Sequence, residues 1–109
     1  MSLPQNIQKL YPYKGHRIDV GGGSLHFLDE GESDTTILAL HGNPTLSFYW
    51  RGLVEAFHET HRVVIPDHIG CGLSDKPQDW TYQLEDHIQN IEKLVTHLDL
   101  KKIHLVVHD

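Results

Sequence analysis

The sequence has little cysteine, no long apolar run and no excess of positive charge. Cys71 is the only cysteine among 109 residues, which excludes an internal disulfide and any Cys-x-x-Cys metal or redox motif. No segment approaches the ~18 consecutive apolar residues that a membrane-spanning helix needs. Nine Lys and Arg oppose fifteen Asp and Glu, for a net charge of −6, and the cations are scattered along the chain. We therefore expect no nucleic-acid or membrane partner and a small, apolar or weakly polar substrate.

What is present is typical of a globular protein, with 39% apolar and 22% charged residues. The first ten residues lack a basic cluster followed by an apolar stretch, so we expect no secretory signal and a cytoplasmic location. The ten histidines share no metal-ligand spacing, and pairs such as His58 with His61 lack further partners nearby. No metal site is expected.

Five segments have the patterns of β-strands. Residues 17–20 and 25–30 partly alternate apolar with polar side chains around a glycine-rich stretch, which predicts a hairpin of half-exposed strands. Residues 36–40, 62–66 and 103–107 are instead continuous apolar runs, as expected of strands buried on both faces of a parallel sheet.

Helical patterns occupy the connections between these runs. Apolar residues at helical spacing predict a crossover helix within 45–57, weakened by Gly52, and a clearer one over 84–98 with Thr81 as its N-cap. Strand, helix, strand, helix, strand is the order of a doubly wound, mostly parallel α/β sheet, here with a leading antiparallel hairpin at its edge.

Two polar residues follow predicted parallel strands. Asp109 comes directly after the run 103–107, where α/β-hydrolase chains place their nucleophile on a sharp turn, and Asn43 follows the run 36–40. Ligands of open α/β sheets gather at the carboxyl ends of the strands. If these two strands are neighbours, Asn43 and Asp109 face one crevice, where an amide and backbone N–H groups can hold a developing negative charge.

Three motifs in the same order resemble those of haloalkane dehalogenases, a family of the α/β-hydrolase superfamily. They are LHGNPT at 40–45 followed by FYWR at 48–51, IPDHIGCGLSDKP at 65–77, and LVVHD at 105–109. The resemblance runs from about Leu25 to the last residue. It implies an α/β-hydrolase fold in which residues 1–109 are the N-terminal portion of a single domain, without the lid and the C-terminal part.

The resemblance also implies a mechanism without metal or organic cofactor. Asp109 would displace halide and become an alkyl ester, which a histidine-activated water later hydrolyses. Asn43 would bind the departing halide through its amide and contribute its backbone N–H to the oxyanion hole. The tryptophan that follows the nucleophile in the family, the general-base histidine and its acid lie in the rest of the hydrolase chain. The 109 residues alone are therefore expected to be inactive.

Other interpretations of the same residues stay open. β-Lactone decarboxylases share the His-Gly-Asn-Pro turn and the Asp-His-Ile-Gly loop, whereas epoxide hydrolases usually place an aromatic residue at position 43. A non-catalytic binding protein of the same fold, or a serine esterase with a later nucleophile, are further alternatives. Without the other motifs, Asp109 is also typical of a helix cap, and Asn43 before a proline is typical of a turn. Phe48 and Tyr49 are candidates for lining the substrate pocket, against core packing, while His41 and His68 are expected to be hydrogen-bonded loop residues.

Overall fold

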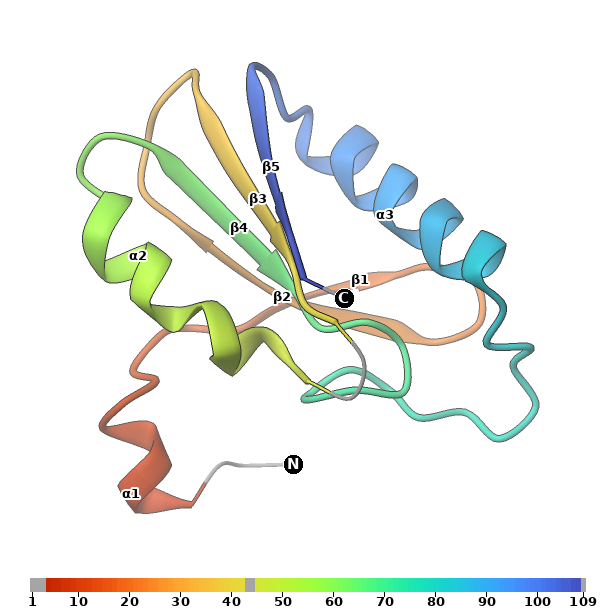
Figure 1. The fold of residues 1–109 in the computed structure, drawn as a ribbon. Coiled ribbons are helices and arrows are strands. Elements are labelled where there is room, and N and C mark those ends of the chain that lie inside the picture. Colours follow the sequence, from red (N-terminus) through yellow and green to blue (C-terminus); the bar gives the residue numbers. More distant parts are fainter. Residues whose placement is uncertain (1–3, 43–44, 109) are drawn as a thin grey trace.

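The computed structural model describes residues 4–42 and 45–108, which form a sheet with helices against both of its faces (Figure 1). The elements in chain order are α1 (Gln5–Gln8), β1 (His16–Asp19), β2 (Ser24–Glu30), β3 (Thr36–Leu40), the 3-10 helix η1 (Ser47–Trp50), α2 (Arg51–Phe57), β4 (Arg62–Pro66), α3 (Leu84–Leu98) and β5 (Ile103–Val107). Every strand predicted from the sequence is present, with bounds that differ by no more than one residue.

The sheet combines an antiparallel hairpin with parallel strands. Within the described residues it has the order β1-β2-β4-β3-β5, in which β1 pairs with β2 and β2 with β4 antiparallel. The pairs β3–β4 and β3–β5 are parallel. This confirms the predicted α/β sheet with a hairpin at one edge. The prediction that both hairpin strands are half-exposed is wrong for β2, in which Leu25 to Leu28 are buried on both faces.

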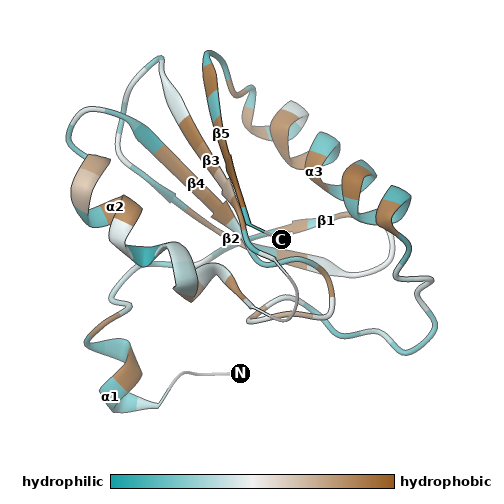
Figure 2. Ribbon diagram, in the orientation of Figure 1, coloured by the Kyte–Doolittle hydropathy of each residue, from teal (hydrophilic) through white to brown (hydrophobic). Residues whose placement is uncertain are grey.

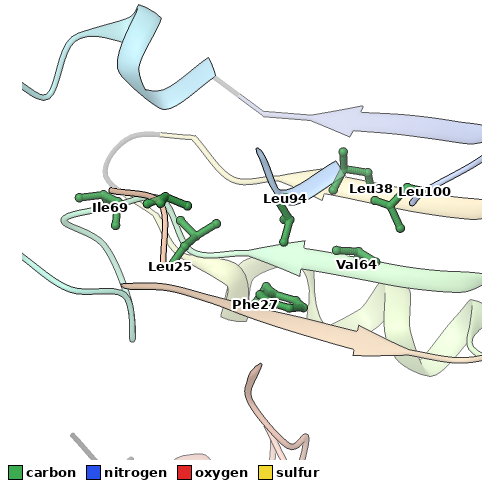
Figure 3. Packing of buried hydrophobic residues seen from close by; sticks show 8 residues of the cluster. Leu25, Phe27, Leu38, Val64, Ile69, Leu94 and Leu100 are labelled. Carbon is green, nitrogen blue, oxygen red and sulfur yellow. The ribbon is translucent and has the colours of Figure 1, made fainter. Parts of the chain in front are cut away.

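Apolar side chains of the central strands are buried on both faces of the sheet. Val64 contributes to a cluster under α3 that includes Leu38 and Leu94, as Figure 3 shows. Its neighbours Val63 and Ile65 belong to a second cluster on the other face, beside α2. Successive side chains of a strand point to opposite faces, so a continuous apolar run is what a strand covered on both sides requires. The prediction for 36–40 and 62–66 is confirmed.

The helix α3 covers one face through its second half. Leu94 is fully buried, and Ile91, Val95 and Leu98 pack around the same cluster. The helix begins after Gln83, whose backbone is extended and whose side chain makes no cap. Thr81 donates instead to the carboxylate of Asp86, so the predicted N-cap is wrong.

The segment 45–57 is only partly α-helical. Leu46 is extended, with φ −157° and ψ 174°, residues 47–50 form a 3-10 turn, and the α-helix proper begins at Arg51. The Ser47 amide is bound by a side chain from the loop after β4, as described below. A long-range contact therefore decides where this helix begins.

The strand β5 differs from its prediction in burial. Ile103, Leu105 and Val107 are 38%, 59% and 62% exposed, although the apolar run predicted a strand buried on both faces. Within the described residues β5 lies at the edge of the sheet beside β3, and the apolar residues of the first half of α3, such as Leu84, are also exposed. Figure 2 shows apolar colour along β5 and on α3. Burial of an edge strand depends on the elements beside it, which its own sequence does not encode.

Membrane insertion through these helices is not supported. None of the helices formed by residues 4–42 and 45–108 is long and apolar enough to cross a lipid bilayer.

Candidate active site

The carboxyl ends of β3 and β5 lie side by side. Leu40 is the register partner of Val107, and the His108 N–H continues the pairing by donating to the Leu40 carbonyl at 3.2 Å. The two strands are therefore neighbours, which is the condition on which the sequence prediction for Asn43 and Asp109 depends. Asn43 and Asp109 follow these ends in the sequence but lie outside the described residues. Their roles as anion-binding amide and nucleophile stay predictions.

Two histidines connect the loop after β3 to the loop after β4. The His68 backbone N–H donates to Nε2 of His41 at 2.9 Å, and Nε2 of His68 donates to the His41 carbonyl at 3.1 Å. Nδ1 of His41 donates to the Gly42 carbonyl at 2.9 Å. The expectation that these are hydrogen-bonded loop residues is confirmed.

A third histidine extends this contact to α3. The rings of His41 and His68 are 4.3 Å apart, and those of His68 and His87 are 5.3 Å apart. Burial, followed by the nearby His41 and His87, lowers the pKa of His68 to about 4. Burial also lowers the pKa of His87, whose buried Nδ1 has no partner among the described residues. His68 is therefore uncharged at neutral pH.

Asp67 is a fully buried carboxylate at the end of β4. Its Oδ1 accepts the Ser47 N–H at 2.6 Å, and its Oδ2 accepts Nδ1 of His26 at 2.8 Å and the Leu73 N–H at 3.1 Å. Burial by itself would raise the pKa of Asp67, but the hydrogen bonds from His26, Ser47 and Leu73 hold it below its usual value. The carboxylate thus joins β2, the loop after β3 and the loop after β4.

The loop after β4 is shaped around this carboxylate. The Ser74 hydroxyl donates to the Asp67 carbonyl at 2.6 Å and accepts the His26 N–H at 2.7 Å. Gly72 has a φ of 52°, and a Cβ at this position would overlap the Asp67 carboxyl group, so glycine is required there. Asp75 accepts the Ser24 N–H at 2.8 Å. Asp67, Ser74 and Asp75 thus each accept at least one hydrogen bond from a backbone N–H.

The N-terminal segment also contacts these loops. Arg17 donates to the Leu73 carbonyl at 2.8 Å and to Oδ1 of Asp75 at 2.9 Å. The Tyr11 hydroxyl is hydrogen-bonded to the Ser47 hydroxyl, and both residues are buried. Residues of the first β-hairpin and of the segment before it therefore support the site loops.

The two aromatic residues predicted to line a pocket lie in different surroundings. Phe48 packs against the second core cluster, with its ring 5.6 Å from that of Tyr11 and the Arg51 guanidinium 4.0 Å above it. Tyr49 is half-exposed, and its ring lies 4.8 Å from that of His108. Tyr49 is therefore next to the end of β5, and its role in a pocket stays a prediction, as does that of Phe48.

A groove of about 880 Å³ opens between α3 and the strands β3 and β5. Its walls are mostly apolar, and its end near the strand termini is lined by His41, His68 and His87. Phe48 and Tyr49 do not line it. Across residues 4–42 and 45–108, no cluster of three or more His, Cys, Asp or Glu side chains is arranged to hold a metal ion.

The pair of His26 and Asp67 was not predicted from the sequence. The available signal is weak: a histidine stands between Leu25 and Phe27, in a strand whose four central residues are all buried. A polar residue within such a run needs a buried partner, but the sequence does not say which one.

A mixed sheet covered on both faces, with hydrogen-bonded loops gathered at the carboxyl ends of its parallel strands, defines an open α/β protein, a class whose ligands generally bind at that edge. Residues 35–109 match the family described as the alpha/beta hydrolase fold. The chain belongs to this family.

Two groups of enzymes are among its relatives. It is 45% identical to cis-3-alkyl-4-alkyloxetan-2-one decarboxylase of Shewanella oneidensis over 106 residues, which are 94% of this chain and 33% of that protein. It is 39% identical to haloalkane dehalogenase 2 of Mycobacterium tuberculosis over 94 residues, or 86% of this chain and 32% of that protein. The chain thus spans about a third of the length of these curated relatives.

Solved structures of haloalkane dehalogenases are also similar to this chain. The tetrameric haloalkane dehalogenase DpaA from Paraglaciecola agarilytica superposes with a TM-score of 0.84 and 39% identity, over 94% of this chain and 39% of that one. Haloalkane dehalogenase DatA from Agrobacterium tumefaciens gives a TM-score of 0.79 and 34% identity, over 88% of this chain and 32% of that one.

Proposed function

We propose that the intact protein is an enzyme in which the carboxylate of Asp109 attacks a carbon atom of a small apolar substrate. The observation that carries this proposal is the parallel pairing of β3 with β5, which extends to Leu40, three residues before Asn43, and to His108, directly before Asp109. Membership of the α/β-hydrolase fold family supports it, because nucleophiles of this fold follow such a strand.

Hydrolytic dehalogenation is the first candidate reaction. Asp109 displaces the halide, with Asn43 as a donor to the departing anion, and an alkyl ester forms on the carboxylate. Water, deprotonated by a histidine beyond residue 109, then attacks the ester carbonyl, and the alcohol leaves as the carboxylate is restored. The products are an alcohol, a halide ion and a proton, and no cofactor takes part.

β-Lactone decarboxylation is the second candidate. A cis-3-alkyl-4-alkyloxetan-2-one that loses carbon dioxide leaves an alkene. The sequence comparison favours this reaction, since identity to the decarboxylase is 45% over 106 residues, against 39% over 94 residues for the dehalogenase. An epoxide hydrolase is a weaker alternative, because Asn43 occupies the position where that group usually has an aromatic residue.

The rest of the hydrolase chain is the partner we propose for the exposed apolar face. Ile103, Leu105 and Val107 line the groove beside α3, and a further part of the same domain would remove this surface from water. That part would also supply a lid, the general-base histidine and its acid. A cytoplasmic location stays a prediction from the sequence.

The test compares both reactions on the intact protein that carries this sequence. Bromide release from short bromoalkanes supports dehalogenation, and carbon dioxide with alkene from a cis-β-lactone supports decarboxylation. Asp109→Asn is expected to lower kcat at least ~1,000-fold in the active assay, as loss of a nucleophile does. Asn43→Ala should lower it less. The exposed Asp79 provides a matched control, because Asp79→Asn changes the same group away from the site.

Two outcomes contradict the proposal. Undiminished turnover of Asp109→Asn would point to another nucleophile, such as a later serine. A folded wild type that forms neither of these products, and that also forms no diol from an epoxide, would favour a non-catalytic binding protein of the same fold.

A further inference from the structure

We infer that Asp67 is a positioning residue that, together with His68, holds the two sides of the segment carrying Asn43. These consecutive residues, here called the Asp67–His68 clamp, touch the chain before and after that segment. The inference rests on the proposed role of Asn43 as the donor to the leaving group or oxyanion.

His68 holds the side that leads out of β3. Its backbone N–H and its Nε2 both bind His41, at 2.9 and 3.1 Å. Beyond His41, the Gly42 carbonyl accepts the N–H of Thr45 at 2.9 Å and its hydroxyl at 2.7 Å. His41 is therefore bound to the loop after β4, and Gly42 and Thr45, which flank positions 43 and 44, are bound to each other.

Asp67 holds the side that leads into η1. Its Oδ1 accepts the Ser47 N–H at 2.6 Å, a short bond of the kind that an ionised acceptor makes. Its Oδ2 is bound by His26 and by the Leu73 N–H, so the carboxyl group cannot rotate without breaking one of these bonds. Because Asp67 is fully buried, water does not replace a bond that is lost.

This geometry connects Asp67 to catalysis without contact with substrate. Donors that stabilise a developing anion act because their positions are fixed before the reaction. A displacement of ~1 Å can lower the rate ~100-fold. Release of Ser47 would free one side of the segment, while His68 still held the other.

Two substitutions at one position isolate the clamp bond. Ser47→Pro removes the amide hydrogen that Asp67 accepts, and proline suits this first residue of η1 because Leu46 before it is extended. Ser47→Ala keeps the amide and loses the hydroxyl, which contacts Tyr11 and also interacts with the Asp67 carboxylate. In the intact protein, and in whichever assay the wild type is active, we expect Ser47→Pro to lower kcat about 10- to 100-fold with KM changed less than threefold. Ser47→Ala should stay within threefold of wild-type kcat.

A second pair measures the clamp without any reaction. Asp67→Asn places an N–H₂ group where Oδ1 or Oδ2 accepts, so the Ser47 amide should exchange with solvent deuterium at least ~10-fold faster, as seen by NMR. Ser74→Ala removes two hydrogen bonds of the same buried network, neither of which reaches Ser47, and should leave that exchange within threefold.

The outcomes separate this inference from the proposed function. Wild-type kcat in a folded Ser47→Pro variant, or unchanged Ser47 exchange in Asp67→Asn, overturns the clamp. If Ser74→Ala lowers kcat as much as Asp67→Asn does, Asp67 acts only through general stability, and the clamp is also overturned. If the wild type forms neither product, the proposed function fails, and the exchange measurement alone decides whether the clamp exists. If Ser47→Pro does not fold, a comparison of kcat between Asp67→Asn and Ser74→Ala takes the place of the Ser47 test.

Discussion

Acidification should destabilise the protein through His68. Its pKa is about 4 in the folded state, against an ordinary value of 6.5, because of burial and of the adjacent His41 and His87, while Asp67 opposes the shift. The unfolded chain therefore binds more protons than the folded one between these two values. Stability from this group is complete above pH ~6.5, falls as the pH drops through the window, and levels off below pH ~4.

The size of the effect follows from the shift. A difference of about 2.5 pKa units corresponds to roughly 3 kcal/mol across the whole window, of which about 2 kcal/mol is lost by pH 5. The assay is urea unfolding of the intact protein at pH 7.5 and pH 5. His68→Gln removes the titrating group, so its loss of stability between these pH values should be about 2 kcal/mol smaller than that of the wild type.

The control is a histidine on the surface. His58 is exposed, and His58→Gln should show the pH dependence of the wild type. Equal losses in His68→Gln and wild type would refute the reasoning, as would an NMR titration in which His68 has its midpoint above pH 6.

Four substitutions test the packing and the backbone geometry, each by urea unfolding of the intact protein. Leu94→Ala removes a fully buried side chain from the cluster under α3 and should lower the free energy of unfolding by about 3 kcal/mol. Leu84→Ala, at a residue that is 75% exposed, should change it by no more than about 0.5 kcal/mol. Similar values for both would contradict the packing. Gly72→Ala places a Cβ against the Asp67 carboxyl group at a φ of 52° and should destabilise by more than about 1 kcal/mol, so a neutral result would contradict the loop geometry. In Gly52→Ala, the added Cβ meets no atom within 4 Å at an exposed position of α2, so the variant should be more stable by about 0.5 to 1 kcal/mol. A loss of stability would mean that this site is not open.

The strands were predictable from the sequence because their patterns are local. The alternation around Gly21 to Gly23 and the apolar runs at 36–40 and 62–66 each specify a strand, and the two runs also specify that both faces are covered. The half-exposed pattern did not predict the burial of Leu25 to Leu28 on both faces of β2. The same rule failed for the burial of 103–107, since exposure at the edge of a sheet is decided by neighbouring elements.

The failures around the site have a different physical cause. The helical pattern of 45–57 did not show that the first turn would be 3-10, because the Ser47 amide is bound by Asp67 from a distant loop. The partnership of His26 with Asp67 spans 41 positions, and no short motif encodes it. That β5 pairs with β3 and not with β4 was only a condition of the sequence prediction, because the order of elements along the chain does not specify the order of strands in the sheet. Asn43 and Asp109 lie outside the described residues.

The contacts of Tyr11, Arg17 and His26 bear on how hybrid enzymes of this family are built. All three precede residue 35, where the match to the family begins, yet they hydrogen-bond to Ser47, Asp67 and the loop around Leu73. A hybrid that joins residues 35–109 to the N-terminal segment of another relative would keep every family motif but lose these hydrogen bonds. Such hybrids should retain function only when the N-terminal segment of the other relative has equivalent hydrogen-bonding side chains.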